Sequence, residues 1–361
     1  LDRQSTAFDG FDPTGDAVWM AENEHEATHV KCHKLRLAFF FAAMRHFRDE
    51  LRQRGCEVHY HALQADARQD RGKTFADILK ADGKRLKPDK LIVVEPGDWR
   101  VRQMLRDAAG ELDIELEERV DKHFYCSLDT FEDWSAGKKE LVLEHFYRWM
   151  RKRENILLTR EGKPVGAEWN FDKDNRETFG KQGPPEHKLP RKFKPDATTR
   201  AVMELVGARF ASHPGSLEHF DLPVTRKQAL AFLRDFIEHR LPLFGTYEDA
   251  LWAEAHFLFH SRLSAMLNVH LLNPRECVQK AIEAYEAGHA PINSVEGFVR
   301  QLLGWREYIR GVYWKHMPGY IERNALQCED RDVPSFFWDG QTEMNCVKQC
   351  MNNVIQHGYA H

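Results

Sequence analysis

The first third of the chain alternates short apolar runs with amphipathic segments, and this alternation restricts the fold more than any other feature. A short apolar run precedes each long helix pattern, and glycine or proline commonly separates the two. Strand, helix and strand in regular succession favour a doubly wound, mostly parallel α/β sheet. We expect strands at residues 16–21, 56–61, 91–95 and 112–116, and helices at residues 33–51, 74–79 and 101–109.

Composition limits the class of protein. The chain has 361 residues, of which 30% are charged, with a formal net charge of −4, so overall charge does not indicate a nucleic-acid protein. No apolar run approaches the length of a membrane span, and the polar first residues lack a signal-peptide core, so we expect a soluble, cytoplasmic protein. Seven cysteines without a Cys-x-x-Cys pair do not suggest a disulfide framework.

Residues 120–200 have a different character. Four prolines at positions 184, 185, 190 and 195 stand among lysines and arginines, which is typical of an extended basic linker. Such a linker either skirts the surface or contacts DNA phosphates, and the sequence leaves both open. The candidate DNA-binding residues are Arg151, Arg153, Lys188, Arg191, Lys192 and Lys194.

The chain reads as helical from Thr225 onward, and residues 304–314 are its most unusual helix. Two tryptophans and two tyrosines alternate there with arginines and a glutamate. This mixture suits a wall that stacks on a flat, conjugated ligand while charged groups fix the ligand's edges, although an amphipathic core helix would also explain it. Gln301 lies four residues before Trp305, so both side chains are expected to face one ligand. Asn293 followed by Glu296 has the shape of a capping box.

A second candidate segment is the hydroxyl-rich turn at residues 260–264. A turn of this kind that opens a helix can hold phosphate oxygens through main-chain N–H groups and the helix dipole. A capped helix whose arginine faces water is the alternative reading.

The order of five motifs makes the resemblance specific. Gly-Thr-Tyr (245–247), Ser-Arg-Leu-Ser (261–264), Gln-Leu-Leu-Gly-Trp-Arg-Glu-Tyr (301–308), Phe-Phe-Trp-Asp-Gly (336–340) and Met-Asn-Cys (344–346) follow one another. In this order they resemble the photolyase–cryptochrome superfamily, and within it the iron–sulfur bacterial (6-4) photolyases and cryptochromes. The resemblance extends over essentially the whole chain.

The resemblance implies a photolyase-like fold. It implies an α/β antenna-binding domain at residues 1–119, a connector with the basic linker at 120–200, and an all-α FAD-binding domain at 201–361. Relative to the family pattern, the opening strand is expected to be missing. The family also continues beyond residue 361 with further FAD-contacting helices and three more cluster cysteines.

The resemblance also implies roles for particular residues. The FAD phosphates and ribityl chain would lie at Tyr247, His260, Ser261, Arg262, Leu263 and Ser264. The flavin or lesion pocket would be lined by Gln301, Trp305 and Tyr308, and the 6,7-dimethyl-8-ribityllumazine antenna would lie at Glu26 and Phe40. Trp338 resembles the first tryptophan of the electron route to FAD, His361 the first histidine of a catalytic pair, and Cys346 one of four ligands of a [4Fe–4S] cluster.

Three functions are compatible with these features. The first is light-driven repair of (6-4) photoproducts by a monomer acting on UV-damaged DNA, with no membrane partner. The second is a cryptochrome that uses the same FAD for blue-light signalling. The third, suggested by the two ends of the chain, is a flavin-free nucleic-acid-binding or structural fragment.

Overall fold

The computed structural model of the chain describes residues 1–253, 255–328 and 332–360, and these form two compact units. The first unit holds the described residues of Leu1–Asp121, Lys192–Thr225 and Asp330–Ala360. The second holds those of Lys122–Arg191 and Arg226–Glu329. The units are therefore interleaved along the chain, whereas the division into three consecutive domains stays a prediction.

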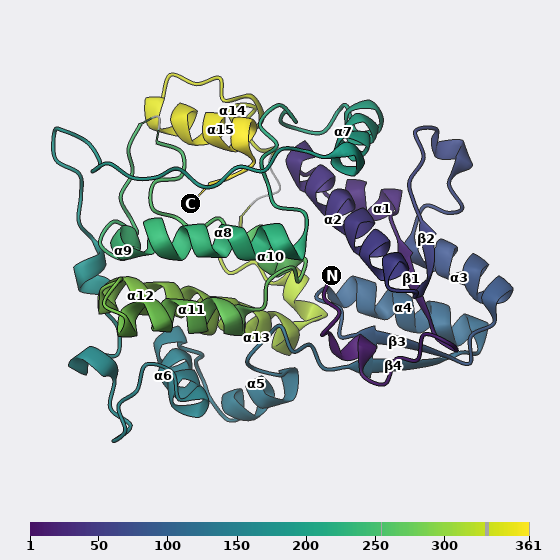
Figure 1. Cartoon of the computed structure of the whole chain (residues 1–361), viewed down its shortest axis with the longest axis horizontal. Coiled ribbons are helices and arrows are strands. Elements are labelled where there is room, and N and C mark those ends of the chain that lie inside the picture. The colour runs from purple at the N-terminus through teal and green to yellow at the C-terminus, as the bar shows by residue number, and fades with distance from the viewer. Residues whose placement is uncertain (254, 329–331, 361) are drawn as a thin grey trace. The chain divides into compact units, whose positions relative to one another are not determined.

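All four strands of the first unit are paired in parallel, as the alternating pattern predicts. Strand β1 (Ala17–Ala21) pairs with β2 (Glu57–His61), and β3 (Lys90–Val94) pairs with β4 (Glu115–Arg119). Helices α1 (Glu24–Thr28) and α2 (Lys34–Gln53) lie between β1 and β2, α3 (Phe75–Leu86) lies between β2 and β3, and α4 (Trp99–Leu112) lies between β3 and β4. The α/β rhythm is therefore confirmed (Figure 1). The strands form two separate two-stranded sheets, however, because no strand of the described residues pairs with both β1 and β3.

The remaining elements of the first unit are helical. Their bounds are η1 (Thr6–Phe8), α1 (Glu24–Thr28), α2 (Lys34–Gln53), η2 (Ala67–Gln69), α3 (Phe75–Leu86), α4 (Trp99–Leu112), α7 (Ala197–Arg209), α14 (Phe336–Asp339) and α15 (Asn345–His357). One face of α2 is buried from Leu35 to Leu51, and this helix packs against α7 and β2. The α3 helix begins with a capping box between Thr74 and Asp77.

The second unit is built from helices, as expected for the C-terminal half. Their bounds are α5 (Leu128–Ser135), α6 (Leu143–Glu154), η3 (Val165–Ala167), η4 (Asp172–Asn175), α8 (Arg226–His239), α9 (Leu241–Phe244), α10 (Ser264–Asn268), α11 (Pro274–Glu286), α12 (Ile292–Val299), η5 (Arg300–Arg306), α13 (Glu307–His316) and η6 (Gly319–Glu322). Phe236, Phe244 and Phe298 meet in its core with ring centroids 5.0–6.0 Å apart. No helix of the described residues is both long enough and apolar enough to cross a bilayer.

Helices α12, η5 and α13 follow one another without a break, and η5 is a π-helix of seven residues. Glycines let neighbouring helices approach this run closely. A Cβ atom at Gly311 would lie 2.1 Å from the Phe131 ring, and one at Gly304 would lie 3.3 Å from the Tyr147 ring. Larger residues at these two positions would push α5 and α6 away.

The capping box predicted at Asn293 is wrong. Pro291 is the N-cap of α12, and Asn293 lies inside the first turn. The Asn293 side chain instead donates to the Asn175 side chain at 3.1 Å.

Candidate functional site

The π-helix η5 presents two of the predicted ligand-lining residues together. Trp305 is 43% exposed, and Gln301 one turn earlier is half-buried. Ile309, four residues after Trp305, is 56% exposed. π-Helical turns inside α-helices occur frequently at functional sites. An exposed indole beside a half-buried amide is an arrangement that can bind a flat ring by stacking and by an edge hydrogen bond.

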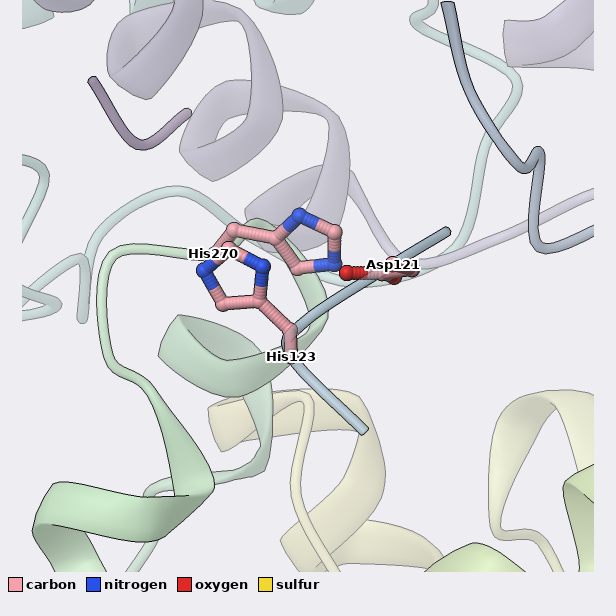
Figure 2. Close-up of side chains that lie close together, drawn as sticks. All are labelled: Asp121, His123 and His270. Atoms are coloured by element: carbon pink, nitrogen blue, oxygen red, sulfur yellow. The ribbon is translucent and has the colours of Figure 1, made fainter. Parts of the chain in front are cut away.

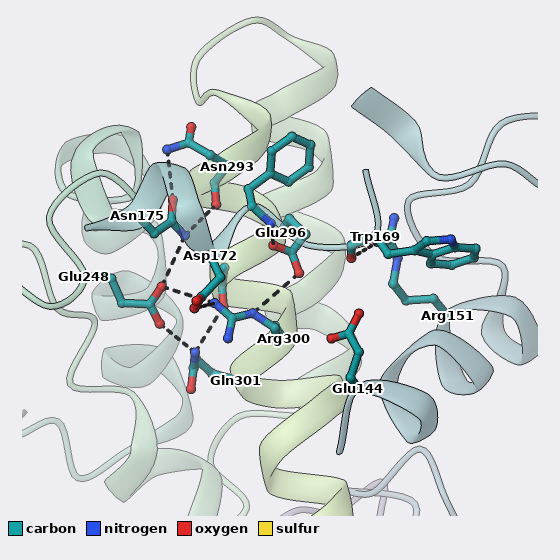
Figure 3. A network of polar contacts seen from close by, with 12 residues as sticks. Glu144, Arg151, Trp169, Asp172, Asn175, Glu248, Asn293, Glu296, Arg300 and Gln301 are labelled. Atoms are coloured by element: carbon teal, nitrogen blue, oxygen red, sulfur yellow. Dashed lines mark hydrogen bonds and ion pairs between the residues drawn. The ribbon is translucent and has the colours of Figure 1, made fainter. Parts of the chain in front are cut away.

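A network of polar side chains surrounds Arg300 and Gln301 at the start of η5 (Figure 3). Gln301 Nε2 donates to Glu248 Oε1 at 2.6 Å, and Asn175 Nδ2 donates to Glu248 Oε2 at 3.3 Å. The Arg300 guanidinium lies 3.7 Å from Glu248, 3.5 Å from Asp172 and 3.6 Å from Glu296. One arginine thus faces three carboxylates.

Burial changes the acidity of two of these carboxyl groups. Removal from water raises the pKa of Glu248 to about 7, while nearby Arg300 and the Asn175 amide oppose the rise. Burial likewise raises the pKa of Glu296, although Glu296 accepts a hydrogen bond from the Phe171 N–H at 3.0 Å. Buried titratable groups beside an exposed aromatic face mark this region as a functional-site candidate.

Tyr308, the third residue predicted to line the pocket, contacts the connector. Its hydroxyl donates to the Leu141 carbonyl at 2.7 Å, and its ring packs against Phe131 and Phe146 of α5 and α6. Tyr308 thereby joins the connector helices to α13.

The charged residues of this helix also face the protein, so their predicted role in fixing ligand edges is wrong. Arg306 donates to the His123 carbonyl at 2.7 Å and lies 3.7 Å over the Phe124 ring. Arg310 donates to the Cys126 carbonyl at 3.0 Å and lies over the same ring. Together with Glu307, these residues hold the connector onto η5 and α13.

The predicted phosphate-binding turn is compact. The Ser261 hydroxyl accepts a hydrogen bond from the Leu263 N–H at 3.3 Å, and Ser264 begins the five-residue helix α10. Arg262 is buried, has a left-handed φ of 56°, and lies 4.0 Å over the Phe257 ring. His260 lies edge-on to Phe244, and Tyr247 stacks on Phe259 with centroids 5.5 Å apart. Aromatic rings therefore pack against Tyr247, His260 and Arg262.

The basic residues proposed for DNA contact divide into two kinds. Arg151 is fully buried and donates to the carbonyls of Ile156, Leu157 and Trp169, so its assignment as a phosphate contact is wrong. Five remain exposed: Arg153, Lys188, Arg191, Lys192 and Lys194. Of these, Lys188 lies 2.7 Å from His239 and 3.5 Å from Asp235.

The first unit contains the other predicted site residues. Glu26 in α1 forms a two-point ion pair with Arg100 at 2.7 and 2.8 Å, and Phe40 in α2 is half-buried with Arg36 over its ring. Trp338 in α14 is 57% exposed. Cys346 and Cys350 are exposed on α15. His361 lies outside the described residues.

Two histidines of the second unit stack face to face. The His123 and His270 rings are 3.9 Å apart and nearly parallel (Figure 2). Asp121, which the same figure labels, is the last residue of the first unit's opening segment. Two imidazoles are fewer ligands than a closed metal site requires, so we assign no metal to this pair.

Comparisons with known proteins agree with this geometry. Residues 1–222 match the family model described as deoxyribodipyrimidine photo-lyase-related protein. A (6-4) photolyase from Agrobacterium fabrum is 40% identical over 356 residues, which cover 98% of this chain and 69% of that protein. The chain belongs to the photolyase-related family.

Solved structures support the fold of this photolyase-related chain. A bacterial class III photolyase from Agrobacterium tumefaciens has a TM-score of 0.58 at 16% identity, with 98% of this chain and 65% of that one covered. A Synechocystis cryptochrome has a TM-score of 0.56 at 14% identity, with coverages of 95% and 66%. The chain thus spans about two thirds of the length of these structures.

The network of polar contacts around Arg300 and Gln301 was not predicted from the sequence. Glu248 directly follows the Gly-Thr-Tyr motif, yet the sequence predicted no role for it, for Arg300 or for Asn175, and it predicted only a capping role for Glu296. One signal was available: Glu296 is a carboxylate inside the apolar run 295–299, which indicates a buried charge in need of partners.

Proposed function

We propose that this chain acts, as a monomer, in light-driven repair of (6-4) pyrimidine photoproducts in UV-damaged DNA. The observation that carries the proposal is the 40% identity with a (6-4) photolyase over 98% of the chain. The π-helix with exposed Trp305 and half-buried Gln301 supports it, because both residues belong to the motif on which the family resemblance rests.

The side chains of the second unit fit FAD. Trp305 offers an exposed indole for stacking, and Gln301 offers an amide beside it. We assign Tyr247 and residues 260–264 to the phosphates and ribityl chain. Bound FAD would supply the electron for reversal of the lesion. The protein's own part is to hold the lesion base out of the duplex, against a stacking surface, with water excluded.

The four-cysteine cluster does not fit the described residues. Cys346 and Cys350 are two thiols on α15, whereas a [4Fe–4S] cluster takes four. No third cysteine joins them in a ligand group within the part of the chain that the structure describes. We keep Cys346 as a proposed ligand and derive no step through the cluster.

The antenna assignment rests on Glu26 and Phe40 in the first unit. Arg100 holds the Glu26 carboxylate by two hydrogen bonds, which fixes the orientation of one potential acceptor for a ribityl hydroxyl. We keep Trp338 of α14, whose side chain is exposed, as the proposed first tryptophan of the electron route to FAD.

A binding experiment tests the stacking surface. Trp305→Ala should weaken binding of FAD or of lesion-containing duplex by roughly five- to 160-fold, because base–aromatic stacking contributes roughly 1–3 kcal/mol. Fluorescence titration of each ligand separately shows which one Trp305 contacts. Ile321→Ala, which truncates a side chain that is 83% exposed, is the matched control. Wild-type affinity of Trp305→Ala for both ligands would contradict the assignment.

A further inference from the structure

The Gln301 amide group is oriented by the protein in a definite sense. Its Nε2 donates to Glu248 Oε1 at 2.6 Å and to the Gly297 carbonyl at 3.4 Å. Both hydrogens of the amide therefore point into the protein. Among the described residues no hydrogen bond reaches the Gln301 Oε1 atom, so this carbonyl oxygen is available to a ligand.

Glu248 determines that orientation because an ionised carboxylate can only accept hydrogen bonds. Its second oxygen, Oε2, faces the Asn175 amide at 3.3 Å and the Arg300 guanidinium at 3.7 Å. Arg300 cannot lose its proton, so Oε2 remains an acceptor. A proton taken up by Glu248 would consequently reside on Oε1, which faces Gln301.

Protonation at Oε1 reverses the roles. The carboxyl group would then donate to Gln301, and the amide must turn over to place its oxygen toward Glu248. The Gln301 NH2 group would then face outward. The exchange gives up only the 3.4 Å contact with Gly297, which is at the weak end of hydrogen-bond geometry.

We propose that Glu248 sets the hydrogen-bonding polarity that Gln301 presents to a ring stacked on Trp305. When Glu248 is ionised, Gln301 offers its carbonyl oxygen, which can accept a hydrogen bond from the N–H of an imide edge. When Glu248 is protonated, Gln301 offers its NH2 group, which cannot accept that hydrogen bond. Glu248 is a positioning residue, since it acts through Gln301. The inference rests on the proposed function for the identity of the ring, because flavins and thymine-derived lesions both carry an imide.

The surroundings of Glu248 place this exchange near neutral pH. Burial raises the pKa of Glu248 to about 7. The charged groups that face it are Arg300 from η5, which favours the ionised form, and Asp249 and Glu296, which oppose it. Asp172 of η4 acts indirectly, because it shares Arg300 with Glu248. The imide N–H itself stays protonated through this range.

The first test needs no ligand. The side-chain amide 15N and 1H signals of Gln301 in the chain should titrate with an apparent pKa near 7. Glu248→Gln should abolish that titration, and Glu286→Gln, which neutralises an exposed carboxylate at the end of α11, should leave it intact. A flat Gln301 signal in the wild type would overturn the inference whether or not the chain proves to repair DNA.

The second test measures affinity between pH 5.5 and 8.5 in two arms, FAD alone and lesion-containing duplex with FAD present. Wild-type affinity in one arm should fall roughly three- to tenfold below pH 7, the size expected for one hydrogen bond. The arm that responds identifies the source of the imide.

Two variants separate positioning from simple electrostatics in this second test. Glu248→Gln should remove the pH step, and Gln301→Met should also remove it although Glu248 still titrates. A pH step that persists in Gln301→Met would overturn the inference, because Glu248 would then be acting directly through its charge. Wild-type binding of both ligands without any pH step would also overturn it. Failure of both ligands to bind at any pH would refute both the proposed function and the assignment of the ring as an imide. The first test would then still decide whether the Gln301 amide turns over when Glu248 is protonated.

Discussion

Glu307 in α13 accepts a hydrogen bond from the main-chain N–H of Cys126 at 3.0 Å, across 181 positions of the chain. Burial raises the pKa of Glu307 to about 7, although Arg306 and Arg310 lie nearby. The folded protein therefore holds the Glu307 proton more tightly than the unfolded chain, in which the pKa is ordinary. Ionisation of Glu307 consequently opposes folding.

The first prediction is a pH dependence of stability. The contribution of Glu307 should be most favourable below about pH 4.5 and should be lost as pH rises toward 7, with a slope of at most about 1.4 kcal/mol per pH unit. Glu307→Gln should reduce the slope of the unfolding free energy over this range, leaving a part that comes from Glu248 and Glu296, whose pKa values burial also raises. Urea unfolding at several pH values measures it. If Glu307→Gln has the same slope of unfolding free energy against pH as the Glu286→Gln control, the prediction is wrong.

The second prediction concerns Arg151, whose buried guanidinium binds three main-chain carbonyls. Arg151→Met should lower the free energy of unfolding by about 3 kcal/mol, because it removes three hydrogen bonds to main-chain carbonyls and leaves the Ile156 carbonyl without its guanidinium donor. The exposed Arg153→Met is the matched control and should change stability by less than about 0.5 kcal/mol. Equal effects of the two substitutions on unfolding would show that burial of Arg151 does not matter.

The third prediction concerns the basic linker. Replacing the exposed Arg191, Lys192 and Lys194 with Gln should weaken binding of damaged and of undamaged DNA to the same extent. Loss of three phosphate contacts should reduce the slope of log affinity against log salt by about 2.7. The control is the triple variant of Lys84, Lys87 and Lys90 to Gln, which removes the same charge from α3, from the residue that caps its C-terminus and from β3. Affinity and salt slope equal to wild type would identify the linker as a spacer.

The fourth prediction concerns Trp338. In FAD-loaded protein, Trp338→Phe should leave flavin bound but slow its photoreduction severely, because phenylalanine is a poor electron donor. Trp149→Phe, a tryptophan packed between Trp134 and Phe146, is the control. Transient absorption under blue light measures both. Normal photoreduction in a folded Trp338→Phe protein would remove this residue from the electron route.

Local patterns in the sequence predicted the secondary structure of the first unit well. The runs at 16–21, 56–61 and 91–95 coincide with β1, β2 and β3, because alternation and β-branched content act within a few residues. The run predicted at 112–116 is displaced, because Leu112 still belongs to α4 and β4 begins only at Glu115. The interleaving of the two units was not predictable in this way. It depends on contacts such as that of His33 with the Ile355 carbonyl, 322 positions apart.

The candidate site shows the same division. The pairing of Gln301 with Trp305 follows from helical spacing, and the structure keeps them on one element. The roles of Arg306, Glu307 and Arg310 were misread, because their partners at residues 123–126 lie more than 180 positions away. The link between Glu248 and Gln301 likewise joins residues 53 positions apart, and no local spacing rule reports it.

The most direct measurement of the central claim is photorepair. The FAD-loaded, reduced chain is incubated with duplexes that carry either one (6-4) photoproduct or one cyclobutane dimer, in blue light and in darkness, and restored bases are counted by chromatography. We expect light-dependent restoration of the (6-4) duplex, with little restoration in the dark or of the dimer. Flavin that is bound and photoreduced while the (6-4) duplex stays unrepaired in blue light would contradict the claim and favour a signalling cryptochrome.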